Sequence, residues 1–260
     1  MASAGPASDL VTLRQDGGVA VISLNRPEQR NAFVPEMAQR FIAVCDEIDR
    51  DDRVGAVVVR GEGEGFCAGA DRAVLAEAGA DPVRADHYRD LGSVYQAFMR
   101  LGRLRVPSIA AVRGSAVGAG LNLMLSADLR IVAEDARLIA GFLRIGIHPG
   151  GGHFRLLNRA VGAEATAAMA LFGEELSGRQ AVGWGLAWQA LPADEVDARA
   201  VELAHRAARD PELTRTATRM LRTMTAEPVD WDVAMEAERS AQMWSLRRRS
   251  EQEASQASAQ

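Results

Sequence analysis

Two glycine-rich turns are the parts of this chain whose residue types and spacing favour chemistry at the backbone. They are residues 66–71 and 114–120, and each follows an apolar run that is typical of a buried strand. Small residues at a strand end can leave backbone NH groups unpaired and directed into a cleft, which makes a site for an anion. Residues 118–120 also let a ligand approach the main chain closely, with the N-terminus of a helix expected from Leu121 behind them. A developing oxyanion would be stabilised there, although many such turns only reverse the chain.

The absence of lysine excludes several kinds of catalysis and of phosphate binding. All 30 basic residues are arginines, because the sequence contains no lysine. Schiff-base chemistry, a lysine base and a Gly-Lys-Ser/Thr phosphate loop are therefore excluded, and a phosphate must be bound by arginine or by backbone NH groups. The glycines of residues 61–66 have the wrong spacing for a dinucleotide-binding fingerprint, and no helix is expected to follow them directly.

The composition indicates a globular protein whose length, 260 residues, allows one large hydrophobic core. A net charge of -5 argues against nonspecific nucleic-acid binding, which needs a basic surface. No apolar run approaches the roughly 18 residues of a membrane span, and the N-terminal residues lack the features of a secretion signal. We therefore expect a cytoplasmic protein with neither nucleic-acid nor membrane partners.

The two cysteines do not indicate a metal site. Cys45 falls in an expected helix and Cys67 in a loop at a strand end, and no CxxC spacing is available to hold zinc. We expect both to be buried free thiols.

Short apolar strands alternate with helices through the first half of the chain. The pattern predicts a hairpin of residues 10–14 and 19–24, a loop at 25–32, helices at 35–50 and 84–103, and buried strands at 54–60, 106–112 and 129–133. Such alternation is typical of parallel strands joined by right-handed crossovers, so the expected class is α/β.

Beyond residue 160 the pattern becomes almost wholly helical. Helices are expected at residues 163–172, 178–183, 195–209, 212–224 and 231–246, with one short strand-like run at 187–191. Residues 247–260 are polar and poor in apolar anchors, so we expect a frayed tail there.

Five blocks together resemble, in order and spacing, the signature blocks of the crotonase (enoyl-CoA hydratase/isomerase) family. They are residues 25–32, 66–71, 107–120, 126–130 and 145–152, and the resemblance extends over residues 10–210. It implies a crotonase-like spiral of ββα units with a helical C-terminal region, assembled as a homotrimer or a dimer of trimers. It also implies an acyl-CoA thioester as substrate, with coenzyme A as part of that substrate and no separate cofactor.

The resemblance divides the chain into three parts. Residues 1–195 would form the ββα spiral core with the acyl-CoA site. Residues 196–246 would form a helical region that serves oligomerisation or covers the site, and residues 247–260 would be the polar tail.

In this family the thioester carbonyl accepts hydrogen bonds from two backbone NH groups. At the matching positions the donors are Ala70 and Ala119, whose side chains matter little because the donor is the main chain. The resemblance also assigns substrate contacts to Arg30, Ala32, Ala68, Gly69, Asp71, Gly118 and Phe142.

The contacts expected with coenzyme A have ordinary structural alternatives. Arg30 would meet the phosphates and Ala32 would contact the pantetheine or nucleotide through its main chain, while Ala68 and Asp71 would lie against the adenine. Arg30 could equally be a solvated loop charge. Asp71 could equally cap the helix that follows it.

The sequence departs from the family at the two glutamates that activate water in its hydratases. The alignment places Asn122 and Phe142 at these positions. Asparagine can orient a water molecule but cannot take its proton, and phenylalanine does neither. General acid/base catalysis contributes roughly 10²-fold or more, so we expect standard hydratase activity to be weak or absent. The carboxylate that isomerases of the family use is absent as well, and no acid falls near Gly150.

Histidines are the remaining local candidates for a base. His148 lies in a block that borders the acyl pocket in relatives and could act near neutral pH, unless its ring is bonded to a loop carbonyl. We rank His153 behind it, because it would begin a helix, where its ring could cap that helix instead of facing the pocket. His87 and His205 fit surface positions.

Three functions agree with these residues. The first is an enoyl-CoA hydratase/isomerase-like protein that stabilises a thioester enolate at Ala70 and Ala119, with an unusual base or none. The second is a non-catalytic acyl-CoA binder, which the missing carboxylates favour. The third is a crotonase-type thioester hydrolase or C–C lyase, to which no particular residue points.

Overall fold

The computed structural model describes residues 10–224 and 231–258, and its core is a six-stranded sheet. The strands are β1 (Val11–Asp16), β2 (Val19–Leu24), β3 (Ala56–Gly61), β4 (Ser108–Val112), β6 (Leu129–Ala133) and β9 (Gln189–Leu191), in the order β1-β2-β3-β4-β6-β9. β1 and β2 form an antiparallel hairpin, and every other neighbouring pair is parallel. The hairpin and the buried strands predicted from the sequence are confirmed.

A second sheet of three short strands stands beside the first. It consists of β5 (Ser115–Val117), β7 (Arg137–Ile139) and β8 (Leu176–Ser177), with β5 parallel to β7 and β7 antiparallel to β8. The sequence analysis did not predict β7 or β8, because two or three residues are too few for a recognisable alternation. A parallel bridge between Cys67 and Ala116 connects β5 to the chain that leaves β3.

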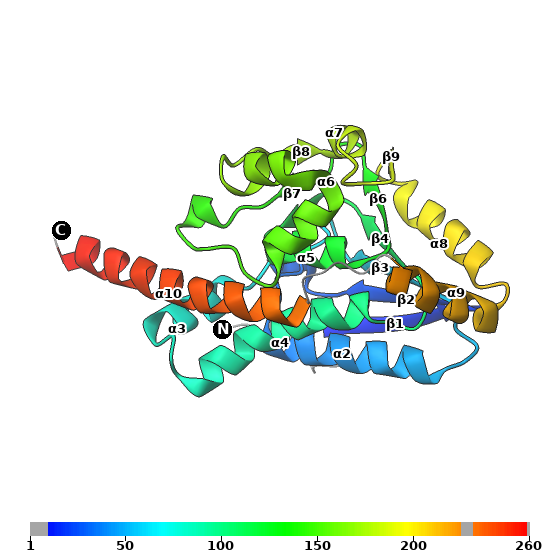
Figure 1. The fold of residues 1–260 in the computed structure, drawn as a ribbon, viewed down its shortest axis with the longest axis horizontal. Helices are drawn as coiled ribbons and strands as arrows, with labels where there is room; N and C mark the ends of the chain where they lie inside the picture. Colours follow the sequence, from blue (N-terminus) through cyan, green and yellow to red (C-terminus); the bar gives the residue numbers. More distant parts are fainter. Residues whose placement is uncertain (1–9, 225–230, 259–260) are drawn as a thin grey trace.

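Helices cover both faces of the larger sheet. α2 (Pro35–Arg50) and α4 (Ala85–Gly102) pack against each other below β1 and β2 in the view of Figure 1. α8 (Val196–Ala207) packs on β3, β4 and β6. Each of these helices presents buried apolar residues at helical spacing, so burial of one face stabilises it on the sheet.

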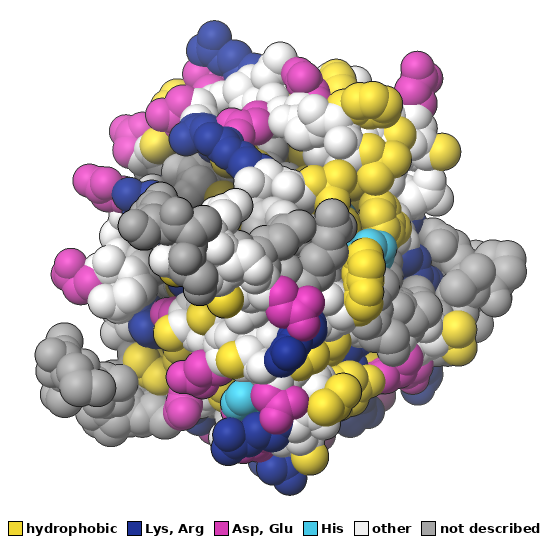
Figure 2. All heavy atoms as spheres, turned by 90° about the vertical axis from the view of Figure 1, so that its left-hand side faces the viewer, with side chains coloured by type: hydrophobic (Ala, Val, Ile, Leu, Met, Phe, Trp, Pro, Cys, Tyr) yellow, Lys and Arg dark blue, Asp and Glu magenta, His cyan; other side chains and the backbone are white. Residues whose placement is uncertain are grey.

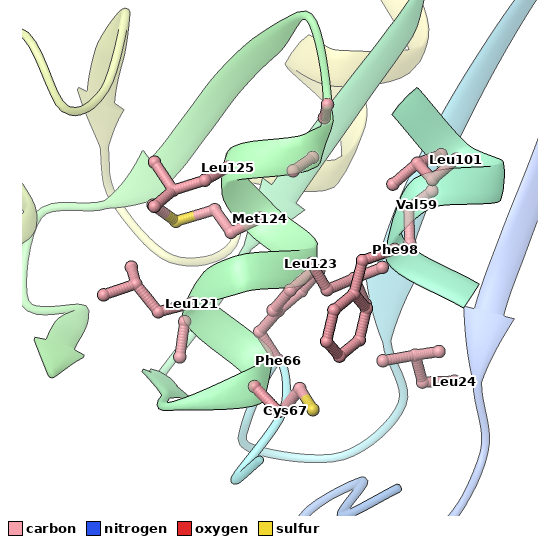
Figure 3. Packing of buried hydrophobic residues seen from close by; sticks show 14 of the residues in the cluster. Leu24, Val59, Phe66, Cys67, Phe98, Leu101, Leu121, Leu123, Met124 and Leu125 are labelled. Atoms are coloured by element: carbon pink, nitrogen blue, oxygen red, sulfur yellow. The ribbon is translucent and has the colours of Figure 1, made fainter. Parts of the chain in front are cut away.

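The helix α5 (Ala119–Ser126) lies in the centre of the molecule, and all its residues are buried. Figure 3 shows Leu123 turned toward Phe98 of α4, with Phe66 and Cys67 packed beneath the helix. The first residues of α5 are therefore held in place by an apolar environment on several sides, which gives the preceding turn a rigid support.

Three further helices connect these layers. They are α3 (Arg72–Ala80), α6 (His153–Ala170) and α7 (Gly178–Gly183), with short 3-10 turns at η1 (Pro27–Gln29) and η2 (Leu143–Ile145). A helix after Asp71 was expected only as one that Asp71 could cap, without bounds, and α3 is that helix. α6 spans two expected helices, one that begins at His153 and one at residues 163–172, and Gly162, with a φ of 77°, interrupts it between them.

The C-terminal part consists of α9 (Pro211–Met224) and α10 (Trp231–Ser258). The expectation of a frayed tail is wrong for residues 247–258, which continue α10 as one long helix (Figure 1). Arg247 and Arg249 each pair with a glutamate four residues on, at 2.6 and 2.7 Å. Arg247 also donates to the carbonyl oxygen of Ala80 at 2.7 Å, because α10 packs on α3.

The surface carries both charges and apolar side chains. On the face drawn in Figure 2, hydrophobic side chains gather in a band on the right of the view, while arginines and acidic residues are spread over the rest. Among the helices of the described residues, none combines the length and the apolar character needed to cross a membrane.

Candidate active site

The turn between β5 and α5 presents the NH group of Ala119. Gly118 has φ 54° and ψ -113°, a conformation that glycine adopts and other residues avoid. The NH of Gly118 donates to the carbonyl oxygen of Ile139 at 2.9 Å. Ala119 is the first residue of α5, so its own NH has no acceptor within the helix, and the hydrogen bonds of the described chain provide none elsewhere.

The turn after β3 presents the NH group of Ala70. Ala70 forms a parallel bridge with Phe33, in which the NH of Phe33 donates to Gly69 at 2.7 Å and the NH of Asp71 donates to Phe33 at 2.9 Å. In a parallel bridge the residue between the two bonded neighbours points its own NH away from the partner strand. The NH of Ala70 therefore points away from Phe33. Within the part of the chain that the structure describes, the NH of Ala70 has no backbone acceptor.

The two turns lie against each other. A methyl group on Gly69 would lie 2.8 Å from the carbonyl oxygen of Val117 and 3.5 Å from the nitrogen of Ala119. The NH of Cys67 donates to the carbonyl oxygen of Ser115 and the NH of Val117 donates to that of Cys67, both at 3.0 Å. Only glycine at residue 69 permits this approach, and it brings both NH groups to one place. An oxygen that carries negative charge could accept a hydrogen bond from each of them.

The loop at residues 25–32 is held against the first turn by Asn31. This side chain is fully buried, accepts a hydrogen bond from the NH of Arg26 at 2.8 Å and donates to the carbonyl oxygens of Glu62 and Gly65 at 2.9 and 2.8 Å. Asn31 also has a positive φ of 56°, which asparagine tolerates better than most residues. The sequence analysis missed this role, for which an asparagine in a turn-rich segment is the available signal.

The residues expected to contact coenzyme A meet along this loop. The NH of Ala68 donates to the carbonyl oxygen of Arg30 at 2.9 Å, and the side chain of Arg30 is exposed. Asp71 accepts a hydrogen bond from the NH of Ala73 at 2.9 Å, so it caps α3. Asp71 also pairs with Arg26 at 3.2 Å, and Arg26 donates to the carbonyl oxygen of Ala32 at 2.5 Å.

Asn122 lies one turn along α5 from Ala119 and contacts the first residue of α6. Its Nδ2 donates to the carbonyl oxygen of Gly150 at 2.8 Å, and its Oδ1 lies 2.7 Å from Nδ1 of His153. Because Nδ2 can only donate, the oxygen of the amide must face the imidazole. Nδ1 of His153 therefore carries a hydrogen and donates it to Asn122.

Phe142 completes this group from the other side. Its ring centroid lies 4.9 Å from that of His153 in an edge-to-face contact, and its Cζ lies 3.6 Å from the place of a methyl group on Gly118. Asn122 and Phe142, at which the sequence analysis expected the two glutamates, thus both contact the same imidazole. Burial lowers the pKa of His153 to about 3, so the ring is neutral at neutral pH.

Of the other histidines, His148 is separated from His153 by Phe154, whose ring contacts both, and His87 and His205 lie at the surface. His148 is half-buried, its Nδ1 lies 2.7 Å from the carbonyl oxygen of Pro149, and its ring contacts Phe154 at 5.8 Å. His87 contacts the carbonyl oxygen of Asp81 at 3.0 Å, and His205 lies 3.3 Å from Asp16 at the surface. The structure places His153, which the sequence analysis ranked second, against Asn122 and Phe142.

The two thiols of the chain are unreactive near neutral pH. Cys45 and Cys67 are free and buried, as predicted from the sequence. Burial raises the pKa of each thiol to about 12, so neither forms a thiolate nucleophile near neutral pH. Among the described residues, no group of three or more histidine, cysteine, aspartate or glutamate side chains could hold a metal ion.

A cleft of about 1340 Å³ lies elsewhere, between α6, α9 and the segment before β4, and many arginines line it. These arginines already hold the fold together. Arg215 donates to the carbonyl oxygen of Asp51 at the end of α2, and Arg222 pairs with Asp128, both at 2.7 Å. The cleft contains neither of the two NH groups, so we place the candidate site at the turns and not there.

Known proteins resemble this chain over most of its length. The sequence profile of the enoyl-CoA hydratase/isomerase family matches residues 14–257. The chain is 40% identical over 225 residues to the probable enoyl-CoA hydratase EchA14 of Mycobacterium tuberculosis, covering 86% of each protein. It is 36% identical over 199 residues to the 1,2-epoxyphenylacetyl-CoA isomerase of Escherichia coli, covering 75% of this chain and 74% of that protein.

A solved structure supports the same relationship. The chain superposes with a TM-score of 0.80 on the crystal structure of an enoyl-CoA hydratase from Mycobacterium avium subsp. paratuberculosis, at 25% identity. The superposition covers 94% of this chain and 95% of that one, and includes the helical C-terminal part.

Proposed function

Because the chain belongs to the enoyl-CoA hydratase/isomerase family, we propose that it binds an acyl-CoA thioester and stabilises the enolate of that thioester. The adjacent NH groups of Ala70 and Ala119 are the observation that carries the proposal. The thioester oxygen accepts a hydrogen bond from each, and both bonds strengthen as negative charge develops on it. One such donor contributes roughly 3–4 kcal/mol to stabilisation of the transition state.

The proposed reaction is a proton transfer, such as isomerisation of an enoyl-CoA. Hydration requires a group that takes a proton from water, and neither Asn122 nor Phe142 can do so. We therefore propose that standard hydratase activity is weak or absent. The names of two relatives, a probable enoyl-CoA hydratase and an acyl-CoA isomerase, support this range of reactions without choosing between them.

Coenzyme A is proposed to bind along the loop at residues 25–32 as part of the substrate, with no separate cofactor. The hydrogen bond between Ala68 and Arg30 joins this loop to the turn that carries Ala70. The exposed Arg30 would meet the phosphates, for which a chain without lysine has only arginine and backbone NH groups. Ala32, Ala68, Gly69 and Asp71 would supply main-chain and packing contacts.

We also propose assembly as a homotrimer or a dimer of trimers, which the family resemblance implies. Large apolar side chains at the surface support it: Phe172 is 85% exposed, Trp188 66% and Leu171 54%. They follow α6 or precede β9, and β8, α7 and β9 lie together at the top of Figure 1. Burial of such residues between subunits would remove apolar surface from water.

A non-catalytic acyl-CoA binder is the second candidate, and the same two positions favour it. With Asn122 and Phe142 in place of acids, the site retains the NH donors without the family's usual bases. The two candidates differ in turnover, because the binder would hold an enoyl-CoA and release it unchanged.

Replacement of Ala119 by proline tests the role of its NH group. Proline fits the first position of a helix and removes the NH, while Ala119→Ser retains it and serves as the matched control. We expect Ala119→Pro to lower kcat/KM for isomerisation of a 3-enoyl-CoA about 100-fold or more, and Ala119→Ser to lower it far less. Calorimetry with an acyl-CoA panel and kinetics of all three proteins provide the measurement.

The outcomes separate the candidates. Wild-type protein that binds acyl-CoA but converts no member of the panel is the non-catalytic binder. Wild-type protein that binds no acyl-CoA at all contradicts the proposed function. Circular dichroism of each variant shows whether a loss of activity reflects a loss of fold.

A further inference from the structure

His153 is a fully buried imidazole between Asn122 and Phe142, and the proposed function gives it no role. We infer that His153 carries the proton of this site: its Nε2 removes a proton from the carbon next to the thioester carbonyl and returns it to the product. Asn122 is the positioning residue that holds the ring. This inference rests on the proposed function, because it requires a thioester held at Ala70 and Ala119.

The hydrogen bonds of Asn122 determine which nitrogen is basic. The amide gives a hydrogen to Gly150 and accepts one from Nδ1 of His153. A neutral imidazole whose Nδ1 carries the hydrogen has its lone pair on Nε2, which is then the proton acceptor. Asn122 thus holds a single tautomer and a single ring orientation, as the carboxylate partner of a catalytic histidine does in other enzymes.

The contacts of His153 place it beside the two NH donors. Ala119 and Asn122 are three residues apart on α5 and are therefore neighbours on one face of that helix. Phe142 touches the imidazole with its ring and approaches Gly118 with its Cζ. The imidazole consequently lies near the turn proposed to hold the thioester oxygen. Asn122, which it contacts, is one helical turn from Ala119, and Phe142 lies between the imidazole and Gly118.

The surroundings of the ring favour a neutral base that is charged only during the reaction. The aromatic rings of Phe142 and Phe154 both contact it, at 4.9 and 6.2 Å between centroids. Burial holds the pKa of His153 well below its usual value in the protein without substrate, so the ring is neutral there. Proton transfer from substrate creates an imidazolium beside an enolate, and the attraction between these opposite charges offsets the desolvation of both.

For a 3-enoyl thioester the reaction balances without another reactant. Nε2 takes a proton from C2, the electrons of that C–H bond form a C1=C2 bond, and the carbonyl π electrons move to the oxygen bound by Ala70 and Ala119. When the carbonyl re-forms, the C1=C2 π electrons form C2=C3, and the C3=C4 π electrons take the proton from Nε2 at C4. The product is a 2-enoyl thioester, and His153 is neutral again.

Exchange of substrate protons with deuterium oxide tests the role of His153 directly. The probe is butyryl-CoA, a saturated thioester that can lose and regain a proton at C2 but cannot isomerise. Glutamine at this position can still donate to Asn122 but cannot act as a base. We expect His153→Gln to slow the exchange about 100-fold or more at an unchanged Kd for the thioester. His205→Gln, at the surface, is the control and should exchange at the wild-type rate.

Three results would overturn the inference. The first is exchange by His153→Gln at the wild-type rate, and the second is loss of exchange in His148→Gln while His153→Gln keeps it. Wild-type protein that binds butyryl-CoA without any exchange also contradicts a proton carrier, whereas failure to bind any thioester contradicts the proposed function itself.

Nitrogen-15 NMR of the histidine-labelled wild-type protein tests the tautomer without relying on a variant that might not fold. We expect Nδ1 of His153 to carry a hydrogen and Nε2 to carry none at neutral pH. On binding acetoacetyl-CoA as its enolate, Nε2 should become protonated. A resting ring with the hydrogen on Nε2 would contradict the proposed orientation, and an Nε2 that stays unprotonated beside the bound enolate would contradict the proton transfer.

Discussion

In the proposed site, Asn122 and His153 would together supply the acid/base group beside the two backbone donors. The sequence analysis expected a glutamate of hydratases at the position of Asn122, and the amide oxygen here lies 2.7 Å from the imidazole of His153. A glutamate can take a proton itself, whereas an asparagine can only orient the group that does. At the scale of single residues, the absence of a carboxylate at Asn122 and Phe142 therefore argues against hydration but not against the proposed proton transfer.

The depressed pKa of His153 makes stability depend on pH. The ring titrates near pH 3 in the folded protein and near 6.5 when unfolded, so between these values only the unfolded chain binds the proton. As pH falls below 6.5, this residue should lower the free energy of unfolding by at most about 1.4 kcal/mol per pH unit. His153→Gln should lack this component. Urea unfolding of both proteins at several pH values between 7 and 5 measures it, and parallel slopes would contradict the expected burial.

At the scale of elements, short turns between strand and helix position the NH donors, and each turn depends on a cap or a glycine. Asp71 ends the first turn, because its side chain caps α3 and pairs with Arg26. Gly118 begins the second, because its positive φ directs the chain from β5 into α5. Neither turn contributes a reactive side chain, so their chemistry resides in backbone geometry.

Two substitutions of Asp71 distinguish its role as the N-cap of α3 from its ion pair with Arg26. Asp71→Ala should lower the free energy of unfolding by about 1–2 kcal/mol through loss of the cap, with a small addition from the ion pair. Asp71→Asn keeps a side-chain oxygen for the NH of Ala73 and should lose only a few tenths of a kcal/mol. Urea unfolding of the three proteins provides the comparison, and equal losses in both variants would contradict a capping role.

Much of the fold could be predicted because its central elements have clear apolar patterns. The buried strands are short continuous apolar runs, and the helix that became α2 has apolar residues at helical spacing. β7 and β8 could not be predicted, because they are only two or three residues long. The continuation of α10 was missed because its support comes from arginine–glutamate pairs and from packing on α3, not from an apolar stripe.

The location of His153 depended on information that spacing does not contain. From the sequence, a histidine at the start of a helix could face the site or cap the helix. Its direction follows from the turn before it, where Gly151 and Gly152 have φ values of 74° and 78°. The amide of Asn122, 31 residues earlier in the chain, then holds the ring. Such a contact between distant segments becomes visible only in the folded chain.

At the scale of the whole molecule, α10 links the site to the periphery. A side chain on Gly150 would collide with Gln242, and a methyl group on Gly152 would lie 2.8 Å from Nε1 of Trp231. The glycine turn that positions His153 is therefore packed under α10, whose middle part, around Leu246 and Arg247, lies against α3. The long C-terminal helix thus contacts both the support of the proposed base and the helix that follows Ala70.

The proposed assembly is tested by sedimentation. We expect the wild-type protein to sediment as a trimer or a hexamer. Phe172→Asp should shift it toward smaller species, because it places a charge in an apolar contact. Val83→Asp, at another exposed apolar residue in the loop between α3 and α4, is the matched control and should leave the assembly unchanged. A stable wild-type monomer would contradict the proposal.

The fixed position of the His153 ring has a stereochemical consequence. If the two backbone donors hold the thioester as proposed, an imidazole that Asn122 fixes in one orientation would face only one side of the substrate plane. A base held there removes a proton from one face of the dienolate and can return it only to that face. Isomerisation should therefore be suprafacial: a substrate with deuterium in one prochiral position at C2 should pass the label to C4, and its mirror-labelled counterpart should retain the label at C2.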